Sequence, residues 1–217
     1  MGDELVFYTN PMSRGRIARW MLEEVGRPYR TEVVEFGPPM KAPGYRAVNP
    51  MGKVPALVHG GQVVTEVAAI CAYLADAFPE AGLAPEPAAR GAYYRWLFFA
   101  AGPLEAATTN RALSVEVPED RRGMVGYGSL GDVLDTLEAA LDGREFIAGD
   151  RFSAADVYVG SHIGWGLRFQ TIDPRPAFTA YCQGRVNRPA AVQARDLDDA
   201  LMPNPEVEVE VEVEVES

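Results

Sequence analysis

The segment MGKVPALVHGGQVVTEVAAICAYL, residues 51–74, decides the fold of this chain. Short apolar runs at 56–58 and 63–64 flank Gly60 and Gly61, and this pattern predicts a β-hairpin. A helical sequence follows directly, and Glu66 stands at its expected start. The segment therefore predicts a hairpin that leads straight into a helix.

Pro55 marks the entry to this hairpin. Proline donates no backbone hydrogen bond and biases Val54 toward an extended conformation, so we expect the N–H and C=O of Val54 to lack a strand partner. An extended peptide could pair there. The Glu66 carboxylate and the free N–H groups of the helix start are expected beside the same opening, and they suit a zwitterionic peptide. The alternative is that both residues have structural roles only: Pro55 forms part of a turn, and Glu66 interacts favourably with the helix dipole.

Two short motifs in this segment resemble those of the glutathione transferase family. The family carries V-P-x-L at a cis-proline turn and Glu-Ser at a helix start, which correspond to residues 54–57 and to Glu66-Val67. This chain has Val67 where the serine is usual, but a helix N-terminus binds anions through its main chain. The resemblance implies that the glutathione site consists of Lys53, Val54, Pro55, Glu66 and Val67.

The elements before the hairpin complete a thioredoxin-like order. Apolar patterning predicts a strand over 5–9, a helix over 16–25 that Gly26 ends, and a strand over 30–34. A loop at 36–39 and a short helix over 41–48 follow. With the hairpin and a helix over 66–78, the order is βαβ followed by ββα.

The remainder of the chain is predicted to be all-helical. Three prolines between 79 and 87 indicate a stiff connection. Ser153 and Asp156 form a capping box, similar to the S-x-A-D segment of the family's helical domain. We therefore predict a thioredoxin-like glutathione-binding domain over 1–78, a linker over 79–87, an all-helical domain over 88–205 and a low-complexity Glu-Val tail over 206–217. Every glutamate of that tail falls on one face of a would-be strand, so we expect the tail to be mobile.

Composition excludes several classes of protein. A chain of 217 residues with 47% hydrophobic content is long enough to bury a core, and its net charge of -11 disfavours a nucleic-acid partner. No apolar run approaches a membrane span and no basic leader precedes one, so we expect a cytoplasmic protein without membrane contact. With two histidines and two distant cysteines, Cys71 and Cys182, we expect neither a metal site nor a disulfide framework.

A glycine-rich motif at 126–131, GYGSLG, matches the dinucleotide pattern G-x-G-x-x-G. The preceding residues 119–123 are charged and do not form a buried strand, so no βαβ unit surrounds the motif. We interpret these glycines as residues that either allow close approach of helices or loosen the start of the following helix.

Thiol activation is expected where the first strand meets the first helix. A free thiol has a pKa of about 8.5, and lowering it by about two units requires roughly 2.7 kcal/mol of preferential stabilisation of the anion. Ser13 is the first choice for the donor, Asn10 and Tyr8 are the reserves, and the alternative role for Ser13 is an ordinary helix cap. Residue offsets vary within the family, so the resemblance does not choose among the three.

The resemblance implies a homodimeric transferase that uses glutathione as a substrate. The thiol would attack an electrophilic, apolar co-substrate, against helical-domain aromatics such as Tyr94, Phe98, Trp165 and Phe169. One alternative is a non-catalytic interaction module that kept the fold, which Val67 favours. A thiol-disulfide reductase would need a cysteine near Ser13, and the sequence has none there.

Overall fold

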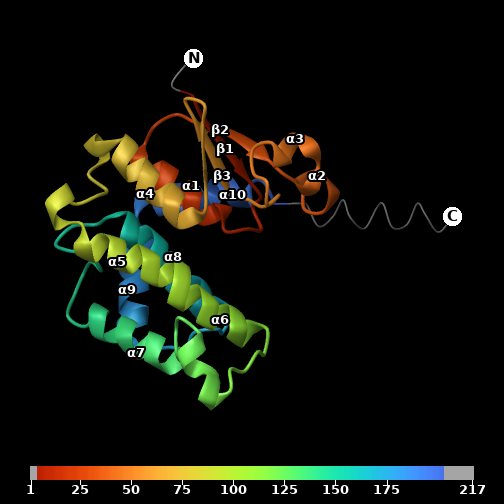
Figure 1. Cartoon of the computed structure of the whole chain (residues 1–217). Helices are drawn as coiled ribbons and strands as arrows, with labels where there is room; N and C mark the ends of the chain where they lie inside the picture. Colours follow the sequence, from red (N-terminus) through yellow and green to blue (C-terminus); the bar gives the residue numbers. More distant parts are fainter. Residues whose placement is uncertain (1–3, 203–217) are drawn as a thin grey trace.

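The computed structural model describes residues 4–202, and the expected tail at 206–217 lies outside them. A four-stranded sheet of order β2-β1-β3-β4 occupies the upper part of Figure 1, and a group of helices occupies the lower part. β1 is parallel to β2 and antiparallel to β3, which pairs with β4 as the predicted hairpin. The thioredoxin-like N-terminal domain and the all-helical C-terminal domain are confirmed.

The N-terminal elements follow the predicted order, with one correction. The structure places two short helices where one was expected over 41–48, and Pro38 and Pro39 open the first of them rather than lying in a loop. Proline suits a first helical turn, and the residue before a proline avoids the helical region, so Ala42 before Pro43 is extended and splits the segment. The elements are β1 (Leu5–Thr9), α1 (Gly15–Val25), β2 (Arg30–Val33), α2 (Pro38–Lys41), α3 (Pro43–Arg46), β3 (Ala56–His59), β4 (Gln62–Thr65) and α4 (Val67–Ala77).

The connection to the helical domain contains two 3-10 turns, each opened by a proline. Helical structure then continues through a π-helical segment with Pro103 inside it, which separates α5 from α6. The elements are η1 (Pro79–Ala81), η2 (Pro87–Ala89), α5 (Gly91–Phe99), η3 (Ala100–Leu104), α6 (Glu105–Ala112), η4 (Glu119–Met124), α7 (Leu130–Leu141), α8 (Ala154–Arg168), α9 (Pro176–Val186) and α10 (Pro189–Asp199). The residue boundaries of the domains stay predictions.

One hydrophobic core runs through both domains. Phe7 of β1, Ile17 of α1 and Ile70 of α4 are buried in the same cluster as helical-domain residues such as Leu104 and Leu137. Because residues of both domains belong to this one cluster, apolar burial between the domains stabilises both of them. A smaller cluster on the other face of the sheet consists of Val34, Met40 and Tyr45, with Tyr8, Val48 and Val54 packed against it.

The last helix, α10, returns to pack against α1 of the N-terminal domain, as Figure 1 shows. Arg19 of α1 donates through Nε to Asp198 Oδ1 at 2.7 Å, and both side chains are buried. Arg188 binds both carboxylate oxygens of Glu24, at 2.6 and 2.8 Å. A buried charge that loses its partner is costly, so these pairs fix α10 on α1.

The start of α8 confirms the predicted capping box. The N–H of Ser153 donates to Asp156 Oδ2 at 2.9 Å, and Asp156 is fully buried. Its Oδ1 accepts from the Ile147 N–H at 2.9 Å and from the Tyr181 hydroxyl at 2.8 Å, while Arg185 lies 3.4 Å away. This carboxylate therefore joins α8 to α9 as well as capping α8.

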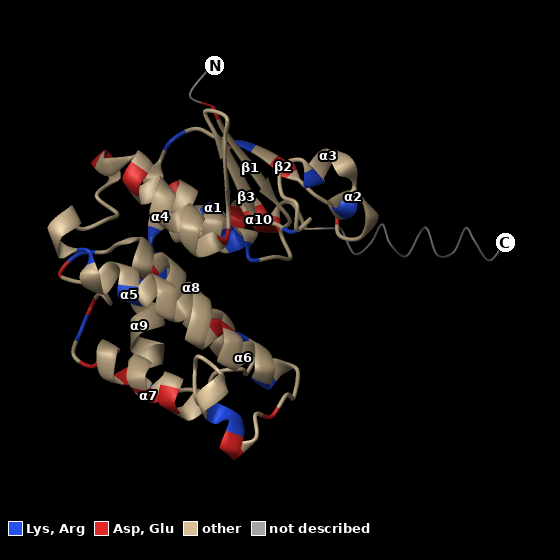
Figure 2. Ribbon diagram, in the orientation of Figure 1, with Lys and Arg blue, Asp and Glu red and all other residues tan. Residues whose placement is uncertain are grey.

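Charged residues of both signs are interspersed over the ribbon in Figure 2, without a single-sign face in that view. None of the helices in residues 4–202 combines the length and the apolar composition needed to cross a membrane. Within the glycine-rich motif, residues 126–129 lie in the loop between η4 and α7 and residues 130–131 begin α7, which Ser129 caps through the N–H of Asp132. Helical elements flank the motif on both sides, so it lies outside any βαβ unit of the kind that binds dinucleotides.

Candidate functional site

The predicted peptide-binding edge lies at the entry to β3. The Val54–Pro55 peptide bond is cis, and Val54 is partly exposed while Pro55 is buried. Within residues 4–202, no hydrogen bond engages the backbone N–H or C=O of Val54. A partly exposed main-chain segment with both groups unpaired is suited to pair with an extended ligand.

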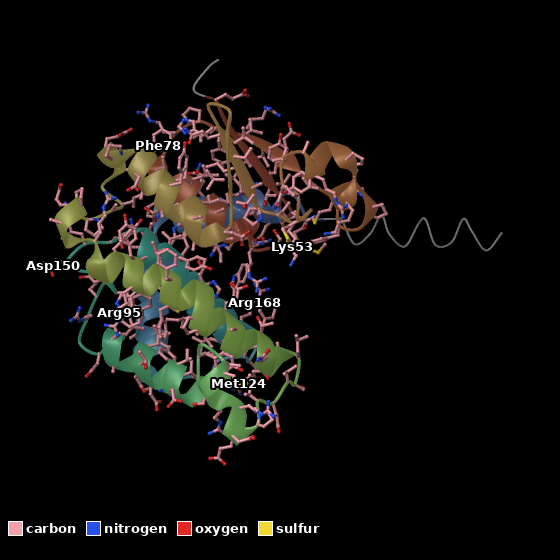
Figure 3. The ribbon with its side chains drawn as sticks, in the orientation of Figure 1. Lys53, Phe78, Arg95, Met124, Asp150 and Arg168 are labelled. Atoms are coloured by element: carbon pink, nitrogen blue, oxygen red, sulfur yellow. The ribbon has the colours of Figure 1, made fainter. Side chains whose placement is uncertain are left out.

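The residue before this edge is held in place by side chains. The Lys53 carbonyl accepts from the Tyr45 hydroxyl at 2.7 Å and from Asn49 Nδ2 at 2.7 Å. Burial raises the pKa of Tyr45 to about 12, so its hydroxyl stays protonated and keeps donating at neutral pH. These two hydrogen bonds therefore hold the backbone of the loop before β3 in place. The Lys53 side chain itself is exposed, as Figure 3 shows.

Glu66 occupies a sterically unusual backbone conformation at the start of α4. Its φ is 66° and its ψ is 119°, which is rare for a residue with a Cβ. Its side chain is exposed and makes no capping hydrogen bond, while its carbonyl begins the helix by accepting from the Ile70 N–H at 2.9 Å. Strained residues of this kind cluster at functional sites. No sequence pattern indicated this conformation.

The turn between β1 and α1 uses both Asn10 and Ser13 internally. Asn10 is buried and donates to the Val34 carbonyl at 3.1 Å, while its Oδ1 accepts from the Met12 N–H at 3.0 Å. Ser13 Oγ donates to the Asn10 carbonyl at 2.7 Å and accepts from the Gly15 N–H at 2.9 Å. Of the two, only Ser13 is partly exposed, so its hydroxyl is the one that a bound anion could reach.

Gly15 permits the close approach of α1 to the end of β1. A Cβ at this position would lie 2.0 Å from Thr9 Oγ1, and Thr9 is completely buried. Any residue with a Cβ at this position would have to displace the buried Thr9 side chain. This contact fixes the height of the first helical turn over the sheet.

Tyr8 lies on the other face of the sheet from this turn. Leu5 and Phe7 enter the core beneath α1, and alternation along a strand sends the intervening side chains to the opposite face. The Tyr8 ring lies 5.7 Å from that of Tyr45, in the smaller cluster that also includes Val54. The structure therefore does not bring Tyr8 together with Asn10 and Ser13.

Arg14 is a charged residue of this region that the sequence analysis did not identify. Its Nη2 lies 2.9 Å from Glu105 Oε1 of α6, so this ion pair spans the two domains. Burial, with a smaller contribution from Arg14, lowers the pKa of His162 to about 4. Arg14 thus places a positive charge between the first turn of α1 and the helical domain.

Neither cysteine offers a reactive thiol. Burial raises the pKa of Cys71 to about 12 and that of Cys182 to about 11, so both remain protonated at neutral pH. In the described part of the chain, no group of three or more His, Cys, Asp or Glu residues is arranged to hold a metal ion. Thiolate chemistry at this site would therefore use a ligand's sulfur.

The aromatic residues proposed to face a co-substrate are distributed over two surfaces. Trp165 lines a cavity against α1, whereas Tyr94 and Phe98 are exposed on α5, with exposed fractions of 40% and 70%. Phe169 is also exposed, at the end of α8. The described side chains do not by themselves form the single apolar wall that we expected.

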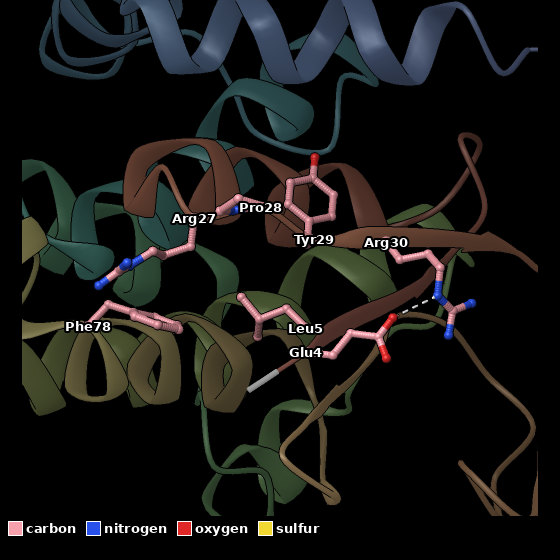
Figure 4. Close-up of a pocket in the computed structure, with 7 residues that line it drawn as sticks. All are labelled: Glu4, Leu5, Arg27, Pro28, Tyr29, Arg30 and Phe78. Atoms are coloured by element: carbon pink, nitrogen blue, oxygen red, sulfur yellow. Dashed lines mark hydrogen bonds and ion pairs between the residues drawn. The ribbon is translucent and has the colours of Figure 1, made fainter. Parts of the chain in front are cut away.

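A separate cavity of about 430 Å³ lies at the start of β1, as Figure 4 shows. Its wall contains the ion pair between Arg30 Nε and Glu4 Oε1 at 3.1 Å, and Arg27 binds Glu80 outside it. Its charges are thus already compensated, and none of the predicted site residues lines it.

Comparisons with known proteins agree with this architecture. The family model for the glutathione S-transferase N-terminal domain matches residues 12–77, and that for the C-terminal domain matches residues 105–184. The chain is 30% identical to glutathione S-transferase GST-4.5 of Xanthomonas campestris pv. campestris over 207 residues, which cover 88% of this chain and 98% of that one.

Solved structures give the same result. A crystal structure of a glutathione transferase from Methylococcus capsulatus superposes with a TM-score of 0.75 at 31% identity, covering 90% of this chain and 99% of the other. A sphingomonad glutathione S-transferase complexed with glutathione superposes with a TM-score of 0.68 at 27% identity, covering 89% and 98%. On this evidence, the chain belongs to the glutathione S-transferase family.

Proposed function

We propose that this protein is a glutathione transferase that binds glutathione and activates its thiol for attack on an electrophilic, apolar co-substrate. The observation that carries the proposal is the unpaired main chain of Val54 beside the strained start of α4 at Glu66. The glutathione complex of the sphingomonad relative supports the choice of ligand.

Each predicted residue has a distinct role in this proposal. The backbone of Val54 pairs with the extended tripeptide, next to Pro55. The exposed Glu66 carboxylate binds the ligand ammonium, and the N–H of Val67 binds a ligand carboxylate at the helix N-terminus. The exposed Lys53 supplies a cation for a ligand carboxylate.

Ser13 is the proposed thiol donor, with Asn10 and Tyr8 as the reserves. The hydroxyl proton of Ser13 can rotate from the Asn10 carbonyl toward a bound thiolate, because a hydroxyl has one proton and two lone pairs. The geometry supports the other two less well, since both Asn10 side-chain atoms are already hydrogen-bonded and Tyr8 faces the smaller cluster.

Calorimetric titration of the full chain with glutathione tests the proposal. Glu66→Ala removes the partner of the ligand ammonium and should weaken binding by at least about tenfold, since charge-assisted hydrogen bonds contribute about 1.5–3 kcal/mol. Glu35→Ala is the matched control, because Glu35 is exposed in the same domain and should leave affinity unchanged. Equal dissociation constants for Glu66→Ala and the parent would remove Glu66 from the site.

The second candidate is a non-catalytic glutathione-binding module, which Val67 favours because it lacks the hydroxyl of the family's usual serine. A thiol-conjugation assay after the titration separates the two functions. Binding with turnover supports the transferase, and binding without turnover selects the module.

We also propose that the protein acts as a homodimer. Tyr94 and Phe98 lie one turn apart on α5 and are both exposed, and large exposed apolar side chains that cluster in this way commonly mark interfaces. Light scattering should report twice the chain mass, and Phe98→Asp should shift the population toward monomer. The predicted cytoplasmic location rests on the sequence alone.

A further inference from the structure

Thr9, at the end of β1, places a hydroxyl group on a face of the strand that is otherwise apolar. Its side chain is completely buried and lies on the same face as those of Leu5 and Phe7, which belong to the hydrophobic core beneath α1. Within residues 4–202, Thr9 Oγ1 has no hydrogen-bond partner. Valine has nearly the same shape and would fill this place without burying an unpaired oxygen. Packing alone therefore does not account for the hydroxyl.

Gly15 leaves the space that this hydroxyl occupies. A Cβ at Gly15 would lie 2.0 Å from Thr9 Oγ1 and 3.0 Å from Ser13 Oγ. The two oxygens thus approach one point at the first turn of α1, and their separation cannot exceed the sum of these two distances. The three heavy atoms nearest to that point all belong to Thr9 and Ser13. The missing side chain at Gly15 therefore brings the unpaired hydroxyl close to the proposed thiol donor.

The hydrogen bonds around Ser13 allow its hydroxyl proton to turn toward a ligand. Ser13 Oγ donates to the Asn10 carbonyl at 2.7 Å, but that carbonyl also accepts from the Ser13 N–H at 3.1 Å and so keeps a donor when the hydroxyl turns away. Ser13 Oγ accepts from the Gly15 N–H at 2.9 Å, which occupies one of its two lone pairs. The other lone pair can then accept a hydrogen bond from a second hydroxyl.

We infer that Thr9 is a positioning residue for thiol activation: its hydroxyl donates to Ser13 Oγ while Ser13 donates to the glutathione thiolate. This inference rests on the proposed function, in which Ser13 is the thiol donor. The two hydroxyls are not hydrogen-bonded to each other in this structure, and catalytic hydrogen bonds commonly shorten when the ligand binds.

The chemical effect of Thr9 is transmitted through Ser13. The thiol loses its proton to solvent, while both hydroxyls keep their own protons, so the negative charge stays on the sulfur. A hydrogen bond received by Ser13 Oγ polarises its O–H group and strengthens the bond that this group donates. Thr9 thus lowers the pKa of the bound thiol without contacting glutathione.

The pKa of the bound thiol tests this inference, measured as thiolate absorbance against pH on the full chain saturated with glutathione. Thr9→Val removes the hydroxyl and should raise that pKa by about 0.3–0.5, a fraction of the roughly one unit expected for loss of the donor itself. At a pH below the pKa, this is about a two- to threefold loss of thiolate. Affinity for glutathione should change little. Thr179→Val, at an exposed threonine of α9, is the matched control and should leave the thiol pKa unchanged.

Two further comparisons separate a role through Ser13 from a general effect on packing. Thr9→Ser keeps a hydroxyl and should retain the parent's thiol pKa, whereas Thr9→Ala differs from it by that one oxygen and should not. This pair gives a result even if Thr9→Val folds poorly. In the double variant Thr9→Val/Ser13→Ala, the pKa should equal that of Ser13→Ala alone, because Thr9 reaches the sulfur only through Ser13.

The possible failures of the inference and of the proposed function are distinguishable. If Ser13→Ala raises the thiol pKa but Thr9→Val leaves it at the parent's value, the inference is overturned and the proposed function stands. Additive effects of the two substitutions also overturn it, because Thr9 would then act independently of Ser13. If Ser13→Ala leaves the pKa unchanged, the assignment of Ser13 as donor fails and the inference fails with it.

Discussion

The pattern Ser-x-x-Asp occurs twice in the helical domain, once exposed and once buried, and it predicts a large difference in stability between two equivalent mutations. Ser129 and Asp132 begin α7, where the serine accepts from the Asp132 N–H at 3.1 Å and donates to its carboxylate at 2.6 Å. Ser153 and Asp156 begin α8 with the same spacing, but Asp156 is fully buried. Replacing each aspartate by alanine therefore compares one local contact in two environments.

The magnitude follows from the groups that each mutation leaves unpaired. Asp132→Ala at an exposed cap should cost about 0.5–1 kcal/mol of unfolding free energy. Asp156→Ala orphans the Ile147 N–H and the Tyr181 hydroxyl, and it removes the carboxylate nearest to the buried Arg185. Each of the two buried unsatisfied donors costs about 1–3 kcal/mol, and a buried charge without its partner costs about 3–5 kcal/mol, so the total should reach at least about 5 kcal/mol.

Urea denaturation, monitored by fluorescence and by circular dichroism, measures the unfolding free energy of both variants. Coincident transitions and an unchanged slope with urea are needed for the free energies to be comparable. Asp156→Asn preserves the shape of the side chain and one acceptor oxygen, so its unfolding free energy should lie between those of the parent and of Asp156→Ala. This variant can still be measured if Asp156→Ala does not fold. A difference below about 1 kcal/mol between Asp156→Ala and Asp132→Ala would refute the reasoning from burial.

Three further predictions concern the Arg19–Asp198 ion pair, the partly buried His162 and the glutathione thiol. Asp198→Ala should cost about 3–5 kcal/mol by leaving Arg19 unpaired, whereas the double variant Arg19→Met/Asp198→Leu should be near neutral; equal losses in urea denaturation would contradict this. Burial lowers the pKa of His162 to about 4, so below about pH 6.5 the histidine binds a proton in the unfolded chain but not in the folded one. The unfolding free energy should therefore fall by about 2 kcal/mol between about pH 7.5 and 5. His162→Leu should abolish that share of the pH dependence, and an identical pH profile would disprove its origin. Ser13→Ala should raise the pKa of bound glutathione by about one unit with little change in its affinity, as measured by thiolate absorbance against pH, and unchanged kinetics would reassign the donor to Asn10 or Tyr8.

The elements that the sequence predicted well are those fixed by local chemistry. The hairpin follows from Gly60 and Gly61 between two apolar runs, and the end of α1 follows from Gly26, whose φ is 70°. The start of α8 follows from Ser153 and Asp156. The prediction of one helix over 41–48 was wrong because Pro43 keeps Ala42 extended, so α2 ends at Lys41 and α3 begins at Pro43.

The features that the sequence did not reveal depend on contacts between distant residues. Arg19 and Asp198 are 179 positions apart, and neither stands in a pattern that indicates its partner. Arg14 meets Glu105 only because the two domains pack together. The backbone conformation of Glu66 was also not foreseen, since glutamate has no preference for a positive φ. A local propensity cannot predict any of these arrangements.

The return of α10 onto α1 has a consequence for biosynthesis. Arg19, near the beginning of the chain, receives its carboxylate from α10, which is the last helix of the described residues to leave the ribosome. A nascent chain that has completed the sheet domain still carries an uncompensated guanidinium between Phe7 and Tyr29, whose rings lie 5.2 and 5.8 Å from it. Maturation of the first domain translated is thus completed by the last helix synthesised, and shortening the chain before Pro189 would harm the N-terminal half first.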